Sequence, residues 1–422
     1  MLTGQILLQL IVILLVVQLC GYLCKRLGQQ WVIGEILAGL ALGPSLLGML
    51  QPHVEEFLFP TSALPTLQTL GDIGLILYMF SLGSRLDTNL MLRQSKKAVL
   101  ISMSGILFPL ILGAALAFSL FPEFGGVKAT LVSFMLLVGT AMAITAFPVL
   151  ARLLSEKNML GTKIGTLALT CAAVDDVAAW CLLALVIAVV NGQNMLVVGS
   201  TVGLTVVFAV SMLLVVRPVL NFIDRHIHSE QVVAALSIVL LLLAAYVTNA
   251  IGIHPVFGAF LMGIILPRKA QFVKLVRNID QVNMLLFLPL FFVYSGLRTQ
   301  IGLINSPWLW LVCLLILAIA CAGKIFGGTF AARVLGESLR DSFSLGILMN
   351  TRGLVELIVL NIGLNLGVLS PTLFAMLVMM ALVTTMMASP LLPLLGYKGK
   401  PAQNQQQTQA VTEELPSRSS PS

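Results

Sequence analysis

The sequence predicts an all-α polytopic membrane protein with about thirteen transmembrane helices. Of its 422 residues, 58% are hydrophobic and only 10% are charged, whereas soluble domains contain about 25% charged residues. The mean hydropathy is +1.02. The apolar residues gather in runs of the ~20 residues that an α-helix needs to cross a bilayer, and lysine and arginine recur in every second loop.

The apolar segments follow one another along the chain with short connections. The first has no basic start and no small-residue cleavage site between Leu2 and Cys24, so it predicts a membrane span and not a cleaved signal. The ninth is short for a full crossing. The thirteen predicted segments cover residues 4–24, 31–50, 64–82, 97–121, 127–154, 160–190, 194–217, 231–250, 253–267, 279–299, 307–334, 339–366 and 371–396.

Lysine and arginine predict the orientation of these segments. Nearly all of the 24 basic residues follow an odd-numbered segment, and cytoplasmic loops carry such an excess. The loops after even-numbered segments contain only Lys128 and Arg298, while Lys324 and Arg352 lie inside apolar runs. We therefore expect a plasma (inner) membrane protein with its N-terminus outside and its C-terminus in the cytoplasm. The net charge of +7 reflects this topology and not a nucleic-acid surface.

Composition also limits what else the chain contains. Residues 398–422 are rich in Gln, Ser, Thr and Pro, a composition that cannot bury enough apolar surface to fold. They predict a disordered cytoplasmic tail after a membrane domain that covers residues 1–397. The 6 cysteines lie in apolar runs without CxxC spacing, which favours small buried hydrophobic residues over disulfides or metal ligands. We expect no cofactor.

A weak internal repeat predicts two halves of opposite orientation. Gly34 and Gly39 in the second segment have the same spacing as Gly258 and Gly263 in the ninth. The string FSLGSR in the third segment is similar to the string YSGLR in the tenth. A shift of seven segments is odd and therefore inverts orientation. Transporters built from inverted repeats bind their substrate where the two halves meet.

Two adjacent carboxylates, Asp175 and Asp176, lie within the apolar run from Ile164 to Val190. A charged side chain at the bilayer centre costs from about 3 to more than 10 kcal/mol, so such residues indicate an ion or proton path. Neighbouring helical residues point about 100° apart. One carboxylate can therefore face an aqueous cavity while the other faces a partner helix, and a carboxylate placed this way holds either a proton or a metal cation.

Two segments contain interruptions, and these are also seven segments apart. In the fifth, Pro148 lacks a backbone donor and its ring clashes with the carbonyl of Ile144, which frees polar backbone beside Thr145. A plain proline kink is the alternative. In the twelfth, a polar cluster interrupts the hydrocarbon segment; it contains Asn350, Thr351, Arg352 and Gly353. If the two breaks cross, they place half-helix ends of both signs beside the aspartate pair.

The remaining intramembrane charges predict ion pairs. Lys324 lies too deep in the eleventh segment to reach the interface, so its expected partner is Asp175 or Asp176. Arg352 and Glu356 have i,i+4 spacing and can pair along one helix face, which favours a structural role.

Three further polar residues have weaker signals. Glu35 lies near the inner end of its segment, and Asp72 is a candidate for tying to a backbone break. His254 precedes Pro255 at the start of the ninth segment, where a loop-edge residue is favoured over a ligand.

Three functional classes fit a buried aspartate pair. The first is a secondary antiporter that exchanges Na⁺ or K⁺ for H⁺ by competition at one site with alternating access. The second is a gated cation channel of the potassium-efflux kind, although no repeat of carbonyl-rich filter loops is present. The third is an intramembrane aspartyl enzyme, which needs two carboxylates converging from different helices. Adjacent residues on one helix diverge, so we expect no enzyme.

Four strings resemble the second family of monovalent cation:proton antiporters, most closely the plant cation/proton exchangers and their bacterial relatives. These are GTAMAITAFPVLARLL, AAVDDVAAW, ACAGKIFGG and LMNTRGLVELIVLNIG, and the likeness covers about residues 5–396. It implies a sodium/proton antiporter-like fold with crossed discontinuous helices, a homodimer formed by one bundle, and a mobile core bundle. Much of the plant branch has Asn where this chain has Asp175.

The resemblance also implies roles for individual residues. Asp176 would bind the transported alkali cation, Na⁺ or K⁺, in exchange for H⁺. Asp175 would pair with Lys324, and Thr145 would lie at the crossover of the broken helices. Arg352 and Glu356 would stabilise the twelfth helix.

Overall fold

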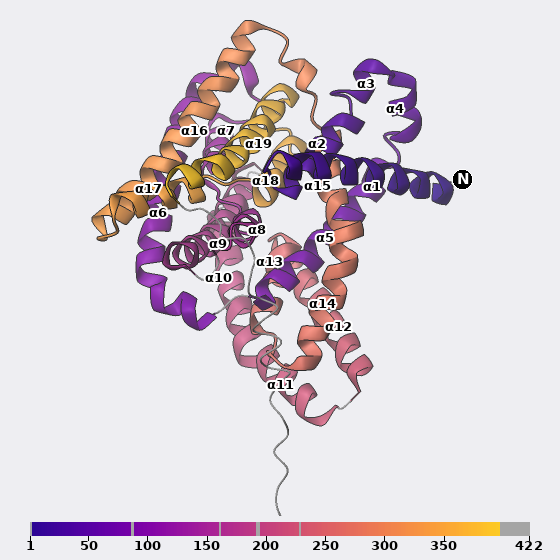
Figure 1. Ribbon diagram of the computed structural model, residues 1–422, viewed down its shortest axis with the longest axis vertical. Helices are drawn as coiled ribbons and strands as arrows, with labels where there is room; N and C mark the ends of the chain where they lie inside the picture. Colours follow the sequence, from indigo (N-terminus) through magenta and orange to yellow (C-terminus); the bar gives the residue numbers. More distant parts are fainter. Residues whose placement is uncertain (1, 86–87, 160–161, 191–194, 228, 397–422) are drawn as a thin grey trace, which may run out of the picture.

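The computed structural model describes residues 2–85, 88–159, 162–190, 195–227 and 229–396. The predicted tail, residues 398–422, lies outside these ranges. Within them, the backbone forms helices and one isolated antiparallel bridge between Gly125 and Leu369. The predicted all-α class is confirmed (Figure 1).

Each predicted segment corresponds to one helix or to one divided pair of helices in the described residues. The undivided helices are α1 (Leu2–Arg26), α2 (Trp31–Leu42), α5 (Leu64–Arg85), α6 (Thr88–Phe124), α9 (Lys163–Val190), α12 (Glu230–Ile251), α13 (Pro255–Ile265), α16 (Pro307–Val334) and α19 (Pro371–Leu394). The short α13 agrees with the short ninth segment.

The divided pairs are of two kinds. Non-helical backbone separates α7 (Leu131–Ala143) from α8 (Phe147–Glu156), and α17 (Leu339–Met349) from α18 (Leu354–Asn365). A π-helical turn joins α10 (Met195–Ser211) to α11 (Arg217–His226), and another joins α14 (Ala270–Val282) to α15 (Leu288–Leu297). Short helices occupy two connections: α3 (Leu47–Leu50), α4 (Pro52–Leu58) and a 3₁₀ turn (Ile301–Leu303).

The second predicted segment, residues 31–50, corresponds to one apolar stretch from Trp31 to Leu50. Within it α2 ends at Leu42, because Gly43 adopts extended backbone before Pro44 and a residue before proline avoids the helical region, and α3 completes the stretch. One predicted boundary was wrong. The tenth segment was expected from residue 279, but the helix begins at Ala270 and carries its charged residues on one face.

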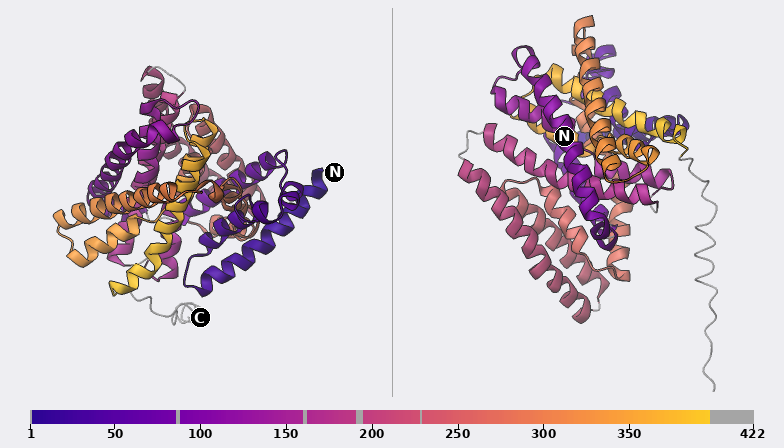
Figure 2. Two further views of the ribbon diagram at one scale, coloured as in Figure 1. Left: turned by 90° about the horizontal axis from the view of Figure 1, so that it is seen from above. Right: turned by 90° about the vertical axis from the view of Figure 1, so that its left-hand side faces the viewer.

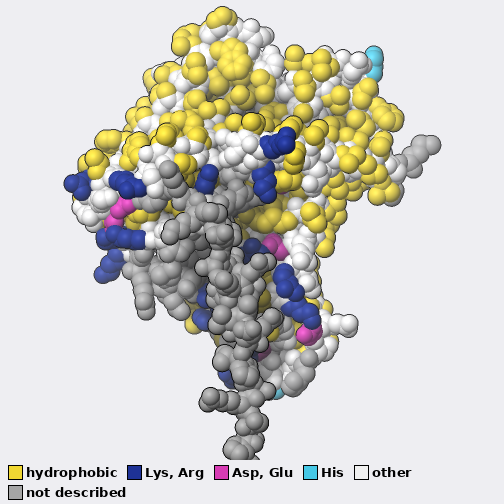
Figure 3. Space-filling view, in the orientation of Figure 1, with side chains coloured by type: hydrophobic (Ala, Val, Ile, Leu, Met, Phe, Trp, Pro, Cys, Tyr) yellow, Lys and Arg dark blue, Asp and Glu magenta, His cyan; other side chains and the backbone are white. Residues whose placement is uncertain are grey.

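The protein is a multi-pass membrane protein. Among the described residues, 9 helical stretches are long and apolar enough to cross a membrane, and shorter apolar helices include α7 and α13. Large hydrophobic side chains are exposed along these helices. Figure 3 shows hydrophobic side chains over the upper part of one face and lysine and arginine side chains across its middle and lower part.

The helices gather into two bundles that meet near the centre of the molecule (Figure 1, Figure 2). The first bundle contains α1, α2, α5, α12, α13 and α15, and the second contains α6, α7, α9, α16 and α17, with each helix packed against others of its own bundle. The two breaks and the aspartate pair belong to the second bundle and its border with α18.

Glycine contacts place the repeated segments in equivalent positions. A Cβ atom on Gly39 of α2 would lie 2.3 Å from the carbonyl oxygen of Val293 on α15. A Cβ atom on Gly263 of α13 would lie 2.1 Å from the carbonyl oxygen of Phe80 on α5. Thus the second helix packs on the tenth as the ninth packs on the third, which is the exchange that inverted repeats require.

We expect Gly263→Ala to lower the stability of the purified protein by about 1–3 kcal/mol, the usual cost of overpacking a closely packed contact. The matched control is Gly105→Ala on α6, where an added Cβ meets nothing within 4 Å. Thermal unfolding in detergent measures both. Equal melting temperatures for the two variants would contradict the close approach of α5 and α13.

Glu337, in the loop between α16 and α17, connects this loop to α6 and α9. Its carboxylate accepts hydrogen bonds from Lys163 Nζ at 2.5 Å and from Lys97 Nζ at 3.0 Å. These two ammonium groups, Lys163 first, hold the pKa of Glu337 below its ordinary value. The cluster ties the start of α9 and the residues after α16 to the side of α6, on the other side of Asp176 along α9 from Trp180.

Candidate functional site

The two helix breaks lie side by side. Residues 144–146 between α7 and α8 are non-helical, and so are residues 351–353 before α18. The backbone N–H of Ala146 donates to the carbonyl oxygen of Thr351 at 3.0 Å, which joins the breaks directly. Gly353 has φ +150°, and a Cβ atom there would lie 2.8 Å from Val149, so this turn requires glycine. Pro148 occupies the first turn of α8, where no intrahelical N–H is needed.

Two basic side chains cap the carboxyl end of α7. Arg352 donates from Nη1 to the carbonyl oxygen of Ala141 at 2.7 Å and from Nη2 to that of Met142 at 2.6 Å. Lys324 Nζ donates to the carbonyl oxygen of Ala143. The last carbonyls of a helix lack intrahelical partners and carry partial negative charge. The two cations therefore satisfy a helix end that is buried in the protein.

Asp175 is fully engaged. Its carboxylate accepts from Lys324 Nζ at 2.9 Å and from the hydroxyl of Ser102 at 2.5 Å. The hydroxyl of Thr145 lies 2.5 Å from Asp175 Oδ2 and 2.8 Å from the carbonyl oxygen of Met349, so its single proton is shared between the two. The structure thus places Lys324 against Asp175 and not against Asp176, and it adds Ser102, which the sequence did not indicate.

Asp176 has the opposite environment. It is 1% exposed, and neither carboxylate oxygen has a hydrogen-bond partner of normal geometry among the described residues. The backbone N–H of Phe147, the first residue of α8, approaches this carboxylate. A helix amino terminus carries about half a positive charge. Asp176 therefore faces a partial charge only, while the full positive charge of Lys324 is taken up by its neighbour.

Arg352 and Glu356 form the i,i+4 ion pair that the sequence predicted. Arg352 Nη1 and Glu356 Oε1 are 3.6 Å apart, and both side chains are fully buried. This separation is longer than a hydrogen bond, and neither oxygen of Glu356 has a hydrogen-bond partner within the described residues. The guanidinium group donates its hydrogen bonds to the end of α7. Arg352 therefore pairs with Glu356 and also joins the start of α18 to α7.

The second break is held by residues from other helices. Thr385 on α19 accepts a hydrogen bond from the backbone N–H of Arg352 at 2.9 Å and donates to its carbonyl oxygen at 2.8 Å. Thr351 donates to the carbonyl oxygen of Leu348 at 2.8 Å. Asn350 donates to Cys321 Sγ at 3.5 Å. The sequence signalled Asn350 and Thr351 but not Thr385, which lies among other small polar residues of α19.

The crossing has one negative charge in excess. Its five buried ionisable side chains are Asp175, Asp176, Glu356, Lys324 and Arg352. Three carboxylates against two basic groups leave a net charge of −1 when every group is ionised. Burying an unbalanced charge costs several kcal/mol. The cluster is therefore electrically balanced when it takes up one positive charge, either a proton or a monovalent cation.

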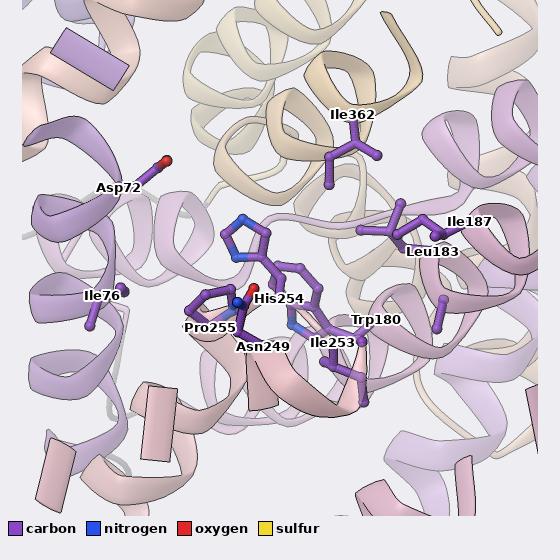
Figure 4. A pocket seen from close by; sticks show the side chains of 12 residues that line it. Asp72, Ile76, Trp180, Leu183, Ile187, Asn249, Ile253, His254, Pro255 and Ile362 are labelled. Carbon is purple, nitrogen blue, oxygen red and sulfur yellow. The ribbon is translucent and has the colours of Figure 1, made fainter. Parts of the chain in front are cut away.

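A cavity of about 310 Å³ lies between the bundles (Figure 4). The residues that line it come from α5, α9, α12, α13, the connection between α12 and α13, and α18; they are Asp72, Ile76, Trp180, Leu183, Ala184, Ile187, Asn249, Gly252, Ile253, His254, Pro255 and Ile362. Trp180 follows Asp176 by one helical turn on α9. Asp72, which the sequence made a weak candidate for tying to a backbone break, lines this cavity.

In the described conformation the cavity stops short of Asp176. Trp180 is 4% exposed and stacks on His254, with ring centroids 5.4 Å apart and planes at 23°. His254 precedes the first residue of α13, at the loop edge where the sequence placed it, and also lines the cavity. On α9 the lining of the cavity ends at Trp180, one helical turn short of Asp176, and Asp176 itself is not among the lining residues.

The chain is similar in sequence to transporters from several kingdoms. The family model for the transmembrane part of sodium/hydrogen exchangers matches residues 11–396. The Na(+)/H(+) antiporter NhaS4 of Synechocystis sp. is 43% identical, over 92% of this chain and 96% of that protein. Cation/H(+) antiporter 18 of Arabidopsis thaliana is 39% identical over 91% of this chain, and K(+)/H(+) antiporter 1 of Saccharomyces cerevisiae is 33% identical over 92%.

The chain spans 48% and 46% of the length of these plant and yeast relatives. The solved structure of the sodium proton antiporter MjNhaP1 from Methanocaldococcus jannaschii superposes with a TM-score of 0.68, at 16% identity, over 94% of this chain and 98% of that one. This likeness establishes the shared fold. On the family match and the sequence identities, the chain belongs to the sodium/hydrogen exchanger family and is a membrane transporter, not an enzyme.

Proposed function

We propose that the chain exchanges Na⁺ or K⁺ for H⁺ across the membrane, with both ions competing for Asp176. The observation that carries this proposal is the burial of three carboxylates with only two basic side chains at the crossing of the breaks, which leaves one negative charge in excess when every group is ionised. One bound proton or one bound alkali cation balances the cluster, and binding both would leave it positive. Competition for one balancing charge couples the two fluxes in opposite directions.

Asp176 is the member of the pair available for exchange. Asp175 is neutralised by Lys324 at 2.9 Å and accepts hydrogen bonds from two hydroxyl groups. Binding a proton or an alkali cation at Asp175 would therefore break an existing ion pair. Asp176 loses no side-chain hydrogen bond when it binds a ligand. Its two carboxylate oxygens are ligands of the kind that a small hard cation requires.

Alternating access follows from the two bundles. The second bundle carries the breaks and the aspartate pair, and the first bundle provides Asp72, Asn249 and His254 on the far wall of the cavity. Movement of one bundle against the other opens the site to one side at a time. The distribution of lysine and arginine supports an orientation with the N-terminus outside and the C-terminus in the cytoplasm. In this orientation the cavity opens on the outer side of the plasma membrane.

We also propose that the protein forms a homodimer through its first bundle.

Everted membrane vesicles that contain the protein test the exchange. A pH-sensitive dye records the proton gradient, and addition of Na⁺ or K⁺ is expected to dissipate it with saturable kinetics. Vesicles without the protein are the control. Cation flux that does not saturate and proceeds without proton movement would indicate a channel and contradict the proposal.

A further inference from the structure

Asp72 lies on the wall of the cavity opposite the aspartate pair. It belongs to α5 of the first bundle, and its side chain points into the cavity toward His254 and the α9 face (Figure 4). The part of the chain that the structure describes offers its carboxylate no ion pair, and Gln68, one turn earlier on α5, is used by the hydroxyl of Tyr294 at 2.9 Å. A half-buried carboxylate without a structural partner is a costly feature that a purely structural account leaves unexplained.

The cavity and Asp176 share one face of α9. Trp180, Leu183 and Ile187 line it, and they follow Asp176 by four, seven and eleven residues. These spacings place all four side chains on one stripe of the helix. The stripe runs from the mouth of the cavity to the buried carboxylate, with Trp180 as the last residue before it.

The polar groups of the cavity suit a cation. Its polar lining side chains are Asp72, Asn249 and His254, and no lysine or arginine is among the described residues that line it. Arg298, the basic residue beside Tyr294, is turned to Asn365 at 2.8 Å and to Asn361 at 3.3 Å. A cleft with low-dielectric walls and charge of one sign concentrates the opposite ion and raises its rate of entry.

We propose that Asp72 and the amide oxygen of Asn249 form an entry site for the monovalent cation, outside the Trp180–His254 stack and before Asp176. This inference rests on the proposed function. The entry site holds the hydrated cation in the cavity until the stacked rings move, and it raises the apparent affinity for the cation on this face. The maximal rate of exchange depends on Asp176 and not on the entry site.

The test compares Asp72→Asn, Asp72→Glu and the unchanged protein in right-side-out and in everted vesicles. Asp72→Asn is expected to raise the KM for Na⁺ or K⁺ added to the outer face by about fivefold, as for loss of one unit charge at contact distance in a water-filled space. The maximal rate is expected to stay the same. Asp72→Glu is expected to restore the KM, because it restores the charge.

Glu56→Gln is the matched control, since Glu56 is exposed in the connection after α2 and loses the same charge outside this cavity. An unchanged outer KM in Asp72→Asn, an equal rise in Glu56→Gln, or an equal rise on the inner face would overturn the entry site while leaving the exchange itself established. Absence of exchange in the unchanged protein would instead refute the proposed function.

Discussion

Asp176→Asn is expected to abolish cation-driven proton movement while leaving the protein as stable as before, or more stable. The amide neutralises the charge on which both ions depend, so exchange should fall at least about 100-fold, the factor that ~3 kcal/mol of lost ligand interaction produces. No side-chain hydrogen bond is lost, because Asp176 accepts none among the described residues. Vesicle assays and thermal unfolding in detergent measure the two effects.

Asp175→Asn is the matched control for this change, since it alters the neighbouring residue in the same way. It removes the charge that pairs with Lys324 and weakens the bonds from Ser102 and Thr145. We therefore expect lower thermal stability for Asp175→Asn and not for Asp176→Asn. If exchange survives in Asp176→Asn, or if that variant is the less stable of the two, the assignment of the two carboxylates is wrong.

Lys324→Ala is expected to destabilise the protein by about 3–5 kcal/mol, the cost of leaving one partner of a buried ion pair without the other. Lys324 is fully buried, and its Nζ serves both Asp175 and the end of α7. The loss should appear as a lower melting temperature and as weakened exchange at every pH.

A double-mutant cycle separates the ion pair from the capping of α7. The double variant Lys324→Ala with Asp175→Asn contains no unpaired charge, so we expect it to be more stable than the sum of the single effects predicts, by at least about 1 kcal/mol. Additive effects would show that the two side chains act independently and would contradict the pairing at 2.9 Å.

The sequence predicted the helices, the two breaks and most of the charged cluster. Hydropathy located the membrane segments because each is an apolar run between basic or turn-forming residues. Asp175, Asp176, Lys324 and Arg352 stood out because an ionisable residue in hydrocarbon is costly wherever it lies. The sequence could therefore predict that these four residues form one buried cluster. Helix geometry also predicted that the two adjacent aspartates point in different directions.

The contacts between distant helices were not foreseeable. Ser102 and Thr385 lie in α6 and α19 among other small polar residues, and only the packing of those helices brings them to Asp175 and to the second break. Arg352 donates to the carbonyl oxygens of α7 because of the way the two breaks cross. The i,i+4 spacing of Arg352 and Glu356 carries no information about that crossing. The location of Asp72 on the cavity depends likewise on the meeting of the bundles.

The central claim is that one proton and one alkali cation displace each other at Asp176. Proton release by the purified protein in weakly buffered detergent solution, recorded with a pH indicator as Na⁺ or K⁺ is added, tests it most directly. The account predicts saturable proton release that disappears in Asp176→Asn and persists in Asp72→Asn at higher cation concentration. Cation binding without proton release, or the same release from Asp176→Asn, would contradict it.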